Sequence, residues 1–242
     1  MTKLAALLIL FFAVLTPASG ATAVAPGSVA ATGIGCISTR YCTPSHGGAF
    51  MVTTRNSCTA ALPVRDRRTG AWYVLTAGHC VAKAAGARWR QSGLTLGIGT
   101  RWEYGATDAG LIRYTANGWI WRAGSRVIVV GRSVRGQRIT SIKVARAGER
   151  VCVTAGRSGV TRCGTVVAAR TSLRYASPGL AARTISNLVM VNGICLQPGD
   201  SGSPVFAGGS FAGIAVAKAN TGCTMWYTRA DVAFARLGVK LG

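Results

Sequence analysis

The segment GDSGSP, residues 199–204, places a serine in a setting suited to nucleophilic chemistry. Glycines beside a hydroxyl let the backbone approach a substrate closely, and successive N–H groups turned the same way can stabilise an oxyanion. Ser201 would be the nucleophile, and the N–H groups of Gly199 and Ser201 would be the two donors. Glycine and serine are also common in turns, so this segment alone leaves a purely structural turn open.

His79 is the candidate base for such a serine. The chain has two histidines, and His79 lies in TAGHC, residues 76–80, which directly follows the strand-like run Trp72–Leu75 and ends at Cys80. A neutral imidazole, titrating near pH ~6.5, can take a proton from a hydroxyl and return it to a leaving amine. His46 lies in a Ser-His-Gly-Gly loop, where we expect a partly buried histidine that bonds to a backbone carbonyl.

Asp108 is the candidate carboxylate that fixes the tautomer of the imidazole. The chain has six acidic residues, and Asp108 precedes an apolar run without a cation next to it. Four others have local explanations: Asp66 lies in an arginine-rich turn, Glu103 is a surface partner for Arg101, Glu149 lies between basic and glycine residues, and Asp231 caps the last helix.

The pattern of short apolar runs predicts an all-β protein. Runs rich in β-branched or aromatic residues and separated by glycine-containing turns predict strands at 72–75, 125–130, 139–144, 165–168, 188–191 and 211–216. Only Ala230–Leu237 has the spacing of an amphipathic helix. Since strands and helices do not alternate, a parallel sheet is not expected.

The first residues are typical of an export signal. Lys3 precedes the apolar stretch Leu4–Leu15, and small residues follow up to an expected cleavage after Ala23. That stretch is shorter than the roughly 20 residues of a membrane-spanning helix. Behind such a signal, the eight cysteines indicate disulfides, not a thiol enzyme or a zinc site. Pairing neighbours along the chain is the simplest arrangement, but counting alone leaves other connectivities open.

The order of these motifs resembles that of a known family. TAGHC at 76–80, Asp108, and CLQPGDSGSP at 195–204 occur in this order. They resemble the chymotrypsin-like serine proteases, in particular the secreted bacterial branch of streptogrisin and alpha-lytic protease type, from about Gly47 to the C-terminus. The resemblance implies two antiparallel six-stranded β-barrels with the catalytic residues in the cleft between them, here followed by a short C-terminal helix.

The resemblance also implies roles for single residues. Ser201 becomes the nucleophile, His79 the general base and then acid, and Asp108 the group that orients His79, while Gly199 and Ser201 form the oxyanion hole. Three bridges are implied, Cys58–Cys80, Cys152–Cys163 and Cys195–Cys223. Cys36–Cys42 is the fourth expected bridge and lies outside the shared pattern.

The sequence departs from the family in two regions. Asp200 is expected to turn inward towards a cation, but Val153 occupies the position where relatives carry the base, so Arg157 is the expected substitute. On the expected substrate-binding strand, Val216 replaces a serine, Ala217 follows, and Lys218 stands where glycine is common. The floor of the substrate pocket is expected at Gly193 and Ile194. Since neither is acidic, we expect small or medium apolar residues before the scissile bond.

These observations predict the organisation of the chain. We expect a signal peptide at 1–23, a flexible mature N-terminus at 24–43, an N-terminal barrel at 44–121, and a C-terminal barrel with the terminal helix at 122–242. The crossing between the barrels is expected around Gly118–Gly124.

The charge of the chain bears on its partners. The chain carries 28 Lys and Arg against six acids, a formal net charge of +22, and the basic residues are scattered. This favours a solvated cationic surface that polyanions of the cell envelope can attract, and it gives no groove for specific nucleic-acid binding. We expect a secreted, monomeric endopeptidase that acts on proteins or peptides without a metal or cofactor. The alternatives are a cationic envelope-binding protein with little turnover on the same fold, and an esterase.

Overall fold

The computed structural model describes residues 35–43, 45–115 and 124–242. The expected signal peptide and most of the expected crossing at Gly118–Gly124 lie outside these residues. The described part is built almost entirely of strands, with two short helices, and confirms the all-β prediction. None of the helices in this part of the chain has the length and apolarity needed to cross a membrane.

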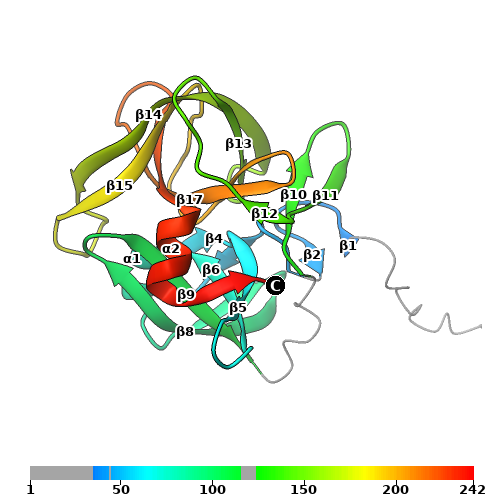
Figure 1. Cartoon of the computed structure of the whole chain (residues 1–242). Helices are drawn as coiled ribbons and strands as arrows, with labels where there is room; N and C mark the ends of the chain where they lie inside the picture. The colour runs from blue at the N-terminus through cyan, green and yellow to red at the C-terminus, as the bar shows by residue number, and fades with distance from the viewer. Residues whose placement is uncertain (1–34, 44, 116–123) are drawn as a thin grey trace, which may run out of the picture. The chain divides into compact units, whose positions relative to one another are not determined.

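The first sheet has eight antiparallel strands (Figure 1). In spatial order they are β19 (Val239–Leu241), β5 (Leu62–Asp66), β6 (Trp72–Thr76), β9 (Asp108–Tyr114), β8 (Leu94–Tyr104), β7 (Arg88–Gln91), β3 (Phe50–Val52) and β4 (Ser57–Thr59). The last strand of the chain, β19, therefore belongs to the first sheet and extends it beyond the six strands that the resemblance implied. A short helix that the sequence pattern did not predict, α1 (Gly78–Ala82), follows β6 directly.

The second sheet closes on itself. Its strands in order are β12 (Ser141–Ile142), β17 (Ser210–Lys218), β16 (Pro204–Ala207), β13 (Arg150–Ala155), β14 (Val160–Tyr175), β15 (Arg183–Asn192) and β18 (Thr224–Arg229). Because β17 pairs with both β16 and β18, six strands form a ring, as the resemblance implied. The short strand β12 pairs with β17 in parallel, which departs from the expected all-antiparallel arrangement.

Two hairpins and a helix complete the fold. The hairpins are β1 (Gly35–Cys36) with β2 (Cys42–Thr43), and β10 (Arg126–Val130) with β11 (Val134–Arg138). Helix α2 (Ala230–Leu237) has the predicted bounds and buries Ala233, Phe234 and Leu237. Its cap differs from the prediction, because Arg229 is the N-cap residue and Asp231 binds the Arg229 guanidinium through both oxygens, at 3.0 and 2.5 Å.

The core explains why these sequences form strands. Strand β7 alternates exposed and buried residues and places Trp89 fully inside the first sheet, and β6 buries Val74 and Leu75. The clearest strand of the sequence, β10, buries Val127 and Ile128. The alternation on β7 is typical of a strand with one solvated face, whereas the consecutive buried residues on β6 and β10 show that both faces of these strands are covered there. The predicted strand at 139–144 is shorter than expected, since only Ser141–Ile142 pairs.

Part of the expected flexible N-terminus is ordered. Residues 35–43 form the β1–β2 hairpin, closed by the Cys36–Cys42 disulfide. Several hydrogen bonds attach the hairpin to the rest of the fold. Among them, the Thr39 hydroxyl donates to the Gly156 carbonyl at 2.8 Å, and the Cys42 N–H donates to the Ser92 hydroxyl at 3.1 Å. The disulfide and these hydrogen bonds supply the order that the composition did not indicate.

All four expected disulfides are present. The structure thereby confirms the three bridges that the resemblance implied and also Cys36–Cys42. Each bridge restricts the unfolded chain, and in the chain-entropy account the stabilisation grows with the length of the closed loop. The first two bridges differ clearly in this respect, with separations of 6 residues for Cys36–Cys42 and 22 for Cys58–Cys80.

Removing these bridges should therefore have unequal effects on stability. The double substitution Cys58→Ala/Cys80→Ala should lower the free energy of unfolding by about 3 kcal/mol, and Cys36→Ala/Cys42→Ala by about 2 kcal/mol. Urea unfolding followed by circular dichroism measures both losses. A larger loss for the shorter loop would contradict the chain-entropy account.

Candidate active site

Asp108 and His79 form a buried pair. Asp108 is the first residue of β9 and is fully buried. Its Oδ1 accepts the backbone N–H of His79 at 2.8 Å, and its Oδ2 lies 2.6 Å from Nδ1 of the imidazole. The Tyr175 hydroxyl, from the end of β14, also donates to Oδ2. With Nδ1 occupied by the carboxylate, Nε2 of His79 is the nitrogen left to act on a substrate or on a serine.

Gly78 allows α1 to lie close enough for this pair to form. A Cβ atom at Gly78 would sit 1.9 Å from the Glu103 carbonyl oxygen and 2.8 Å from the Ala109 nitrogen. Only glycine accommodates such close backbone contact. The next residues fix the other side of the helix, because Cys80 is bonded to Cys58 on β4. His79 is thus held by packing on one side and by a covalent bond on the other.

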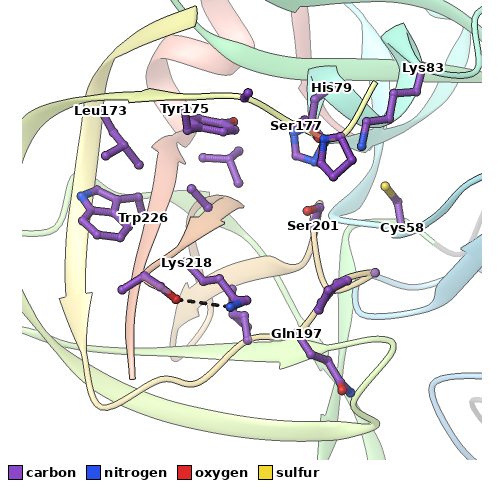
Figure 2. A pocket seen from close by; sticks show the side chains of 18 of the residues that line it. Cys58, His79, Lys83, Leu173, Tyr175, Ser177, Gln197, Ser201, Lys218 and Trp226 are labelled. Carbon is purple, nitrogen blue, oxygen red and sulfur yellow. Dashed lines mark hydrogen bonds between the residues drawn. The ribbon is translucent and has the colours of Figure 1, made fainter. Parts of the chain in front are cut away.

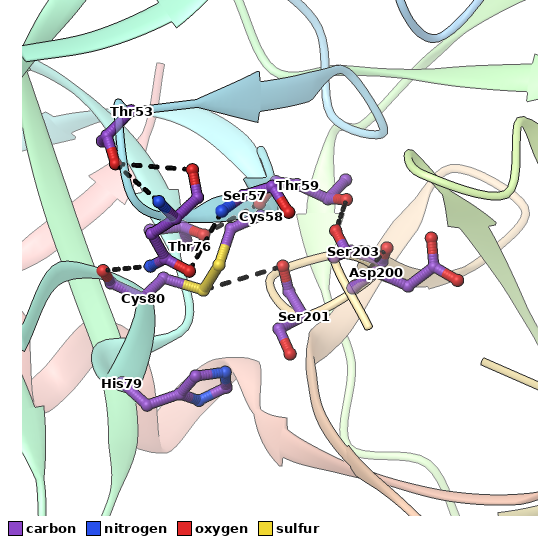
Figure 3. The surroundings of a disulfide bond; sticks show 12 residues. Thr53, Ser57, Cys58, Thr59, Thr76, His79, Cys80, Asp200, Ser201 and Ser203 are labelled. Atoms are coloured by element: carbon purple, nitrogen blue, oxygen red, sulfur yellow. Dashed lines mark hydrogen bonds between the residues drawn. A yellow bond between two sulfur atoms is a disulfide. The ribbon is translucent and has the colours of Figure 1, made fainter. Parts of the chain in front are cut away.

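Ser201 lies on a turn that is bonded to both sheets (Figure 3). Its carbonyl oxygen accepts the Thr59 N–H from β4 at 2.8 Å, and the N–H of Gly202 donates to the Ala215 carbonyl of β17 at 2.8 Å. The Cys80 sulfur lies 3.8 Å from the same Ser201 oxygen. Gly202 adopts φ +91°, and a Cβ there would clash with the Thr59 oxygen at 2.2 Å. The turn therefore depends on glycine and positions Ser201 where the two sheets meet.

The N–H groups of Gly199 and Ser201 have no acceptor within the described residues. Gly199 has φ +97°, and its carbonyl accepts the Thr59 hydroxyl at 2.9 Å. This bond anchors the peptide while its N–H stays available. Two N–H donors without an internal acceptor beside a serine are the arrangement expected of an oxyanion site.

Asp200 turns inward as expected, but Arg157 does not neutralise it. Oδ1 accepts the backbone N–H groups of Arg157 and Ser158 at 2.9 and 3.0 Å. Oδ2 accepts the Ser158 hydroxyl at 2.5 Å and the Gln197 N–H at 3.0 Å. The guanidinium of Arg157 is exposed and lies over the ring of Phe50, 5.5 Å from its centroid. The prediction of an ion pair was wrong, because four hydrogen bonds can stabilise a buried carboxylate without a cation.

His79 and Ser201 face one cleft of about 610 Å³ (Figure 2). Leu173 and Tyr175 of β14, Leu196 and Gln197 before the serine turn, Val216–Lys218 of β17, and Trp226 of β18 also line it. In the described part of the chain no hydrogen bond joins the imidazole to the Ser201 hydroxyl. Such catalytic contacts are often long in the free enzyme and tighten when substrate binds.

The expected substrate-binding residues are only partly in the cleft. Val216, Ala217 and Lys218 line it, and the Lys218 ammonium donates to the Ala219 carbonyl at 3.3 Å. Gly193 and Ile194 do not line it. Ile194 is fully buried in the core of the second barrel, and both of their N–H groups bond to the Cys223 carbonyl. Leu196, two residues after Ile194, lines the cleft.

Sequence reasoning did not anticipate several residues of the site. Tyr175, Leu196 and Trp226 line the cleft, and Ser158 binds Asp200. Leu196 lies in the CLQPGDSGSP motif, and Ser158 directly follows Arg157, so their positions in the sequence could have indicated a place near the site. Tyr175 is 67 residues from Asp108, and nothing in its local sequence indicates the contact.

Other candidate residues have structural roles. Asp66 accepts the N–H groups of Arg68 and Thr69, and Arg101 pairs with it at 2.8 Å, so the expected Glu103–Arg101 pair does not form. His46 is buried, with Nδ1 3.7 Å from the Cys42 sulfur of the Cys36–Cys42 disulfide.

Two groups of side chains have the spacing of metal ligands. They are Cys36, Cys42 and His46, and Cys58, Cys80 and His79. Every cysteine in both groups is disulfide-bonded, which removes the thiolates that a metal would need.

The fold, with Ser201 and His79 at one cleft and the buried Asp108 paired with His79, defines a chymotrypsin-like serine hydrolase. No model of a known protein family matches the chain. Serine protease 2 of Streptomyces fradiae is 31% identical over 170 residues, covering 69% of this chain and 90% of that protein. Streptogrisin-A of Streptomyces griseus is 28% identical over 203 residues, covering 82% of this chain and 62% of that protein.

A solved structure agrees with these relatives. It is described as a glutamic acid specific serine protease that uses a histidine triad in substrate binding. It superposes with a TM-score of 0.68 at 27% identity, over 81% of this chain and 99% of that one. The chain belongs to the bacterial chymotrypsin-like serine proteases and is a hydrolase of that family.

The contacts of Asp200 give a test with a matched control. Asp200→Asn replaces an acceptor by an amide that must face N–H and O–H donors, and should lower the free energy of unfolding by about 2–4 kcal/mol. Arg157→Ala keeps the backbone donors and should change it by less than about 0.5 kcal/mol. Denaturant unfolding measures both, and equal losses would show that the guanidinium, not the backbone, stabilises Asp200.

Proposed function

We propose that the chain is an endopeptidase that cleaves peptide bonds through an acyl-enzyme, with Ser201, His79 and Asp108 as its catalytic triad. The observation that carries the proposal is the buried His79–Asp108 pair, 2.6 Å apart, on the same cleft as Ser201. The carboxylate holds the proton of the neutral imidazole on Nδ1, which leaves Nε2 to accept the proton of Ser201. The same carboxylate then stabilises the imidazolium.

In the first step, the Ser201 oxygen bonds to the substrate carbonyl carbon while its proton moves to His79. The resulting oxyanion accepts the N–H groups of Gly199 and Ser201, whose lack of internal acceptors supports this role. The imidazolium then protonates the leaving amine, the peptide C–N bond breaks, and the acyl group remains on Ser201. Water, deprotonated by His79, releases the acyl group in the second half of the reaction.

The cleft supports a preference for small or medium apolar residues before the scissile bond. Leu196, Val216 and Trp226 give it apolar walls. The similar solved protease is described as specific for glutamic acid through a histidine triad. This chain has only His46 and His79, and neither is free for such recognition, since His79 pairs with Asp108 and His46 lies beside Cys36–Cys42. An apolar side chain is therefore the better partner for this pocket.

Cations at the rim of the cleft add a second preference. Lys83, Arg174 and Lys218 line it, and no acidic side chain is among the described lining residues. Figure 2 shows Lys83 and Lys218 on opposite sides of Ser201. Acidic residues flanking the cleaved bond on either side would meet a positive partner there.

The disulfides and the net charge bear on the compartment in which the enzyme works. Four disulfides favour an oxidising, extracellular compartment, in agreement with the signal-like first residues. The net charge of +22 would keep it close to polyanionic envelope polymers.

Labelling with a fluorophosphonate probe tests the proposed function, because the probe reacts only with an activated serine. The wild-type protein and Ser133→Ala, an exposed serine in the β10–β11 turn, should label, and Ser201→Ala should not. Cleavage of denatured casein should follow the same pattern. An unlabelled wild type would favour the envelope-binding alternative, and ester turnover without casein cleavage would favour an esterase.

Profiling cleavage sites in a random peptide pool tests the substrate preference. Apolar residues should precede the cleaved bond, and Lys218→Ala should weaken the selection of nearby acidic residues about 2- to 5-fold, the scale of an exposed ion pair. Lys240→Ala, an exposed cation on β19, is the control and should leave the profile unchanged. Identical profiles for wild type and Lys218→Ala would contradict the role of the rim cation.

A further inference from the structure

We infer that Tyr175 is a positioning residue for the catalytic pair, acting through Asp108; the inference rests on the proposed triad. Its phenol supplies one of the three hydrogen bonds that the buried carboxylate accepts. The other two come from the backbone N–H and Nδ1–H of His79. Tyr175 would thereby keep Asp108 ionised and aligned with the imidazole.

The charge of Asp108 makes this third donor necessary. The carboxylate is fully buried, and in the described residues its sole ion-pair partner is His79, which is charged only when protonated. The negative charge therefore depends strongly on the hydrogen bonds that reach the carboxylate. A buried anion that loses a donor rises in free energy and moves towards protonation.

Other nearby hydroxyl groups do not take this role. Val216, on the strand that lines the cleft, has no hydroxyl to offer. The Thr228 hydroxyl donates at 3.0 Å to the backbone carbonyl of Asp108, not to its carboxylate. Tyr175 is thus the side-chain hydroxyl that reaches the carboxylate within the described part of the chain.

Packing places Tyr175 and keeps it protonated. Irregular pairing along β14 and β15, between Val166 and Leu173, bends the strand that ends at Tyr175. The Tyr175 ring then stands edge-on to His79 and Tyr104, with centroids 6.3 and 6.0 Å away. The Tyr104 hydroxyl donates to the Tyr175 carbonyl at 3.1 Å. Burial first, and the Asp108 charge second, raise the pKa of the Tyr175 phenol, so it remains a donor at working pH.

The substitution Tyr175→Phe isolates the hydroxyl, because it keeps the ring and its packing. We expect kcat to fall about 10- to 100-fold, the scale of one charge-assisted hydrogen bond, with KM within about 2-fold of wild type. A lesion that only disturbed the cleft would raise KM instead. Tyr104→Phe, which removes a neighbouring hydroxyl with no contact to the carboxylate, should have a clearly smaller effect on kcat.

The pH dependence of turnover gives a second readout. The groups that face His79 are Asp108 of β9, Tyr175 of β14 and Tyr104 of β8, with Lys83 just beyond α1 and attracted by the charge of Asp108. Without the phenol donor, the buried negative charge is less stabilised, which favours uptake of a proton by the site. The acid limb of the pH–kcat/KM profile should therefore move to higher pH in Tyr175→Phe and stay in place in Tyr104→Phe.

The wild-type protein offers a measurement that needs no variant to fold. The Tyr175 hydroxyl proton should give a slowly exchanging downfield NMR resonance, as expected of a buried donor to a carboxylate. Absence of this resonance, or a Tyr175→Phe enzyme with unchanged kcat and an unchanged acid limb, would overturn the inference while leaving the triad intact. Failure of the wild type to react with a fluorophosphonate would instead overturn the proposed function itself.

Discussion

A buried negative charge on Asp108 is the constraint on which the arrangement of the site depends. Without solvent, the carboxylate must take its stabilisation from donors that the fold brings to it. Helix α1 provides two of these donors and can do so because Gly78 permits backbone contact with β8 and β9. Strand β14 provides the third through Tyr175. The first sheet and the second barrel thus contribute to the environment of a single side chain.

The serine turn shows the same dependence on both sheets. Thr59 of β4 and Ala215 of β17 bond to its backbone from opposite sides, and Asp200 anchors it to the β13–β14 turn. These contacts hold the peptides of Gly199 and Ser201 with their N–H groups unused. Donors fixed in this way need little reorganisation when charge develops on a substrate, which is the physical basis of catalysis by an oxyanion site.

Much of this architecture could be predicted from the sequence, and the remainder could not for identifiable reasons. The strand pattern and helix α2 could be predicted from local composition, and the disulfides from the cysteine spacing and the family resemblance. Asp108 could be identified as the candidate carboxylate because the chain has only six acidic residues. The donors to Asp200 could not be predicted, because every residue except proline has a backbone N–H group and the residue type does not show which one will donate. Tyr175 escaped prediction because its contact depends on irregular pairing along β14, which residue types do not reveal. Leu196 lines the cleft and Ile194 does not, because the Ile194 side chain is buried in the core of the second barrel.

The turnover number of an Asp108→Asn variant tests the central claim most directly. The asparagine would favour the wrong imidazole tautomer, so the account predicts a loss in kcat of about 10⁴-fold, with the fold retained. The matched change Asp231→Asn, in the first turn of α2 and outside the cleft lining, should leave kcat unchanged. Full turnover by a folded Asp108→Asn enzyme would contradict the account, because His79 would then act without the carboxylate on which the site is built.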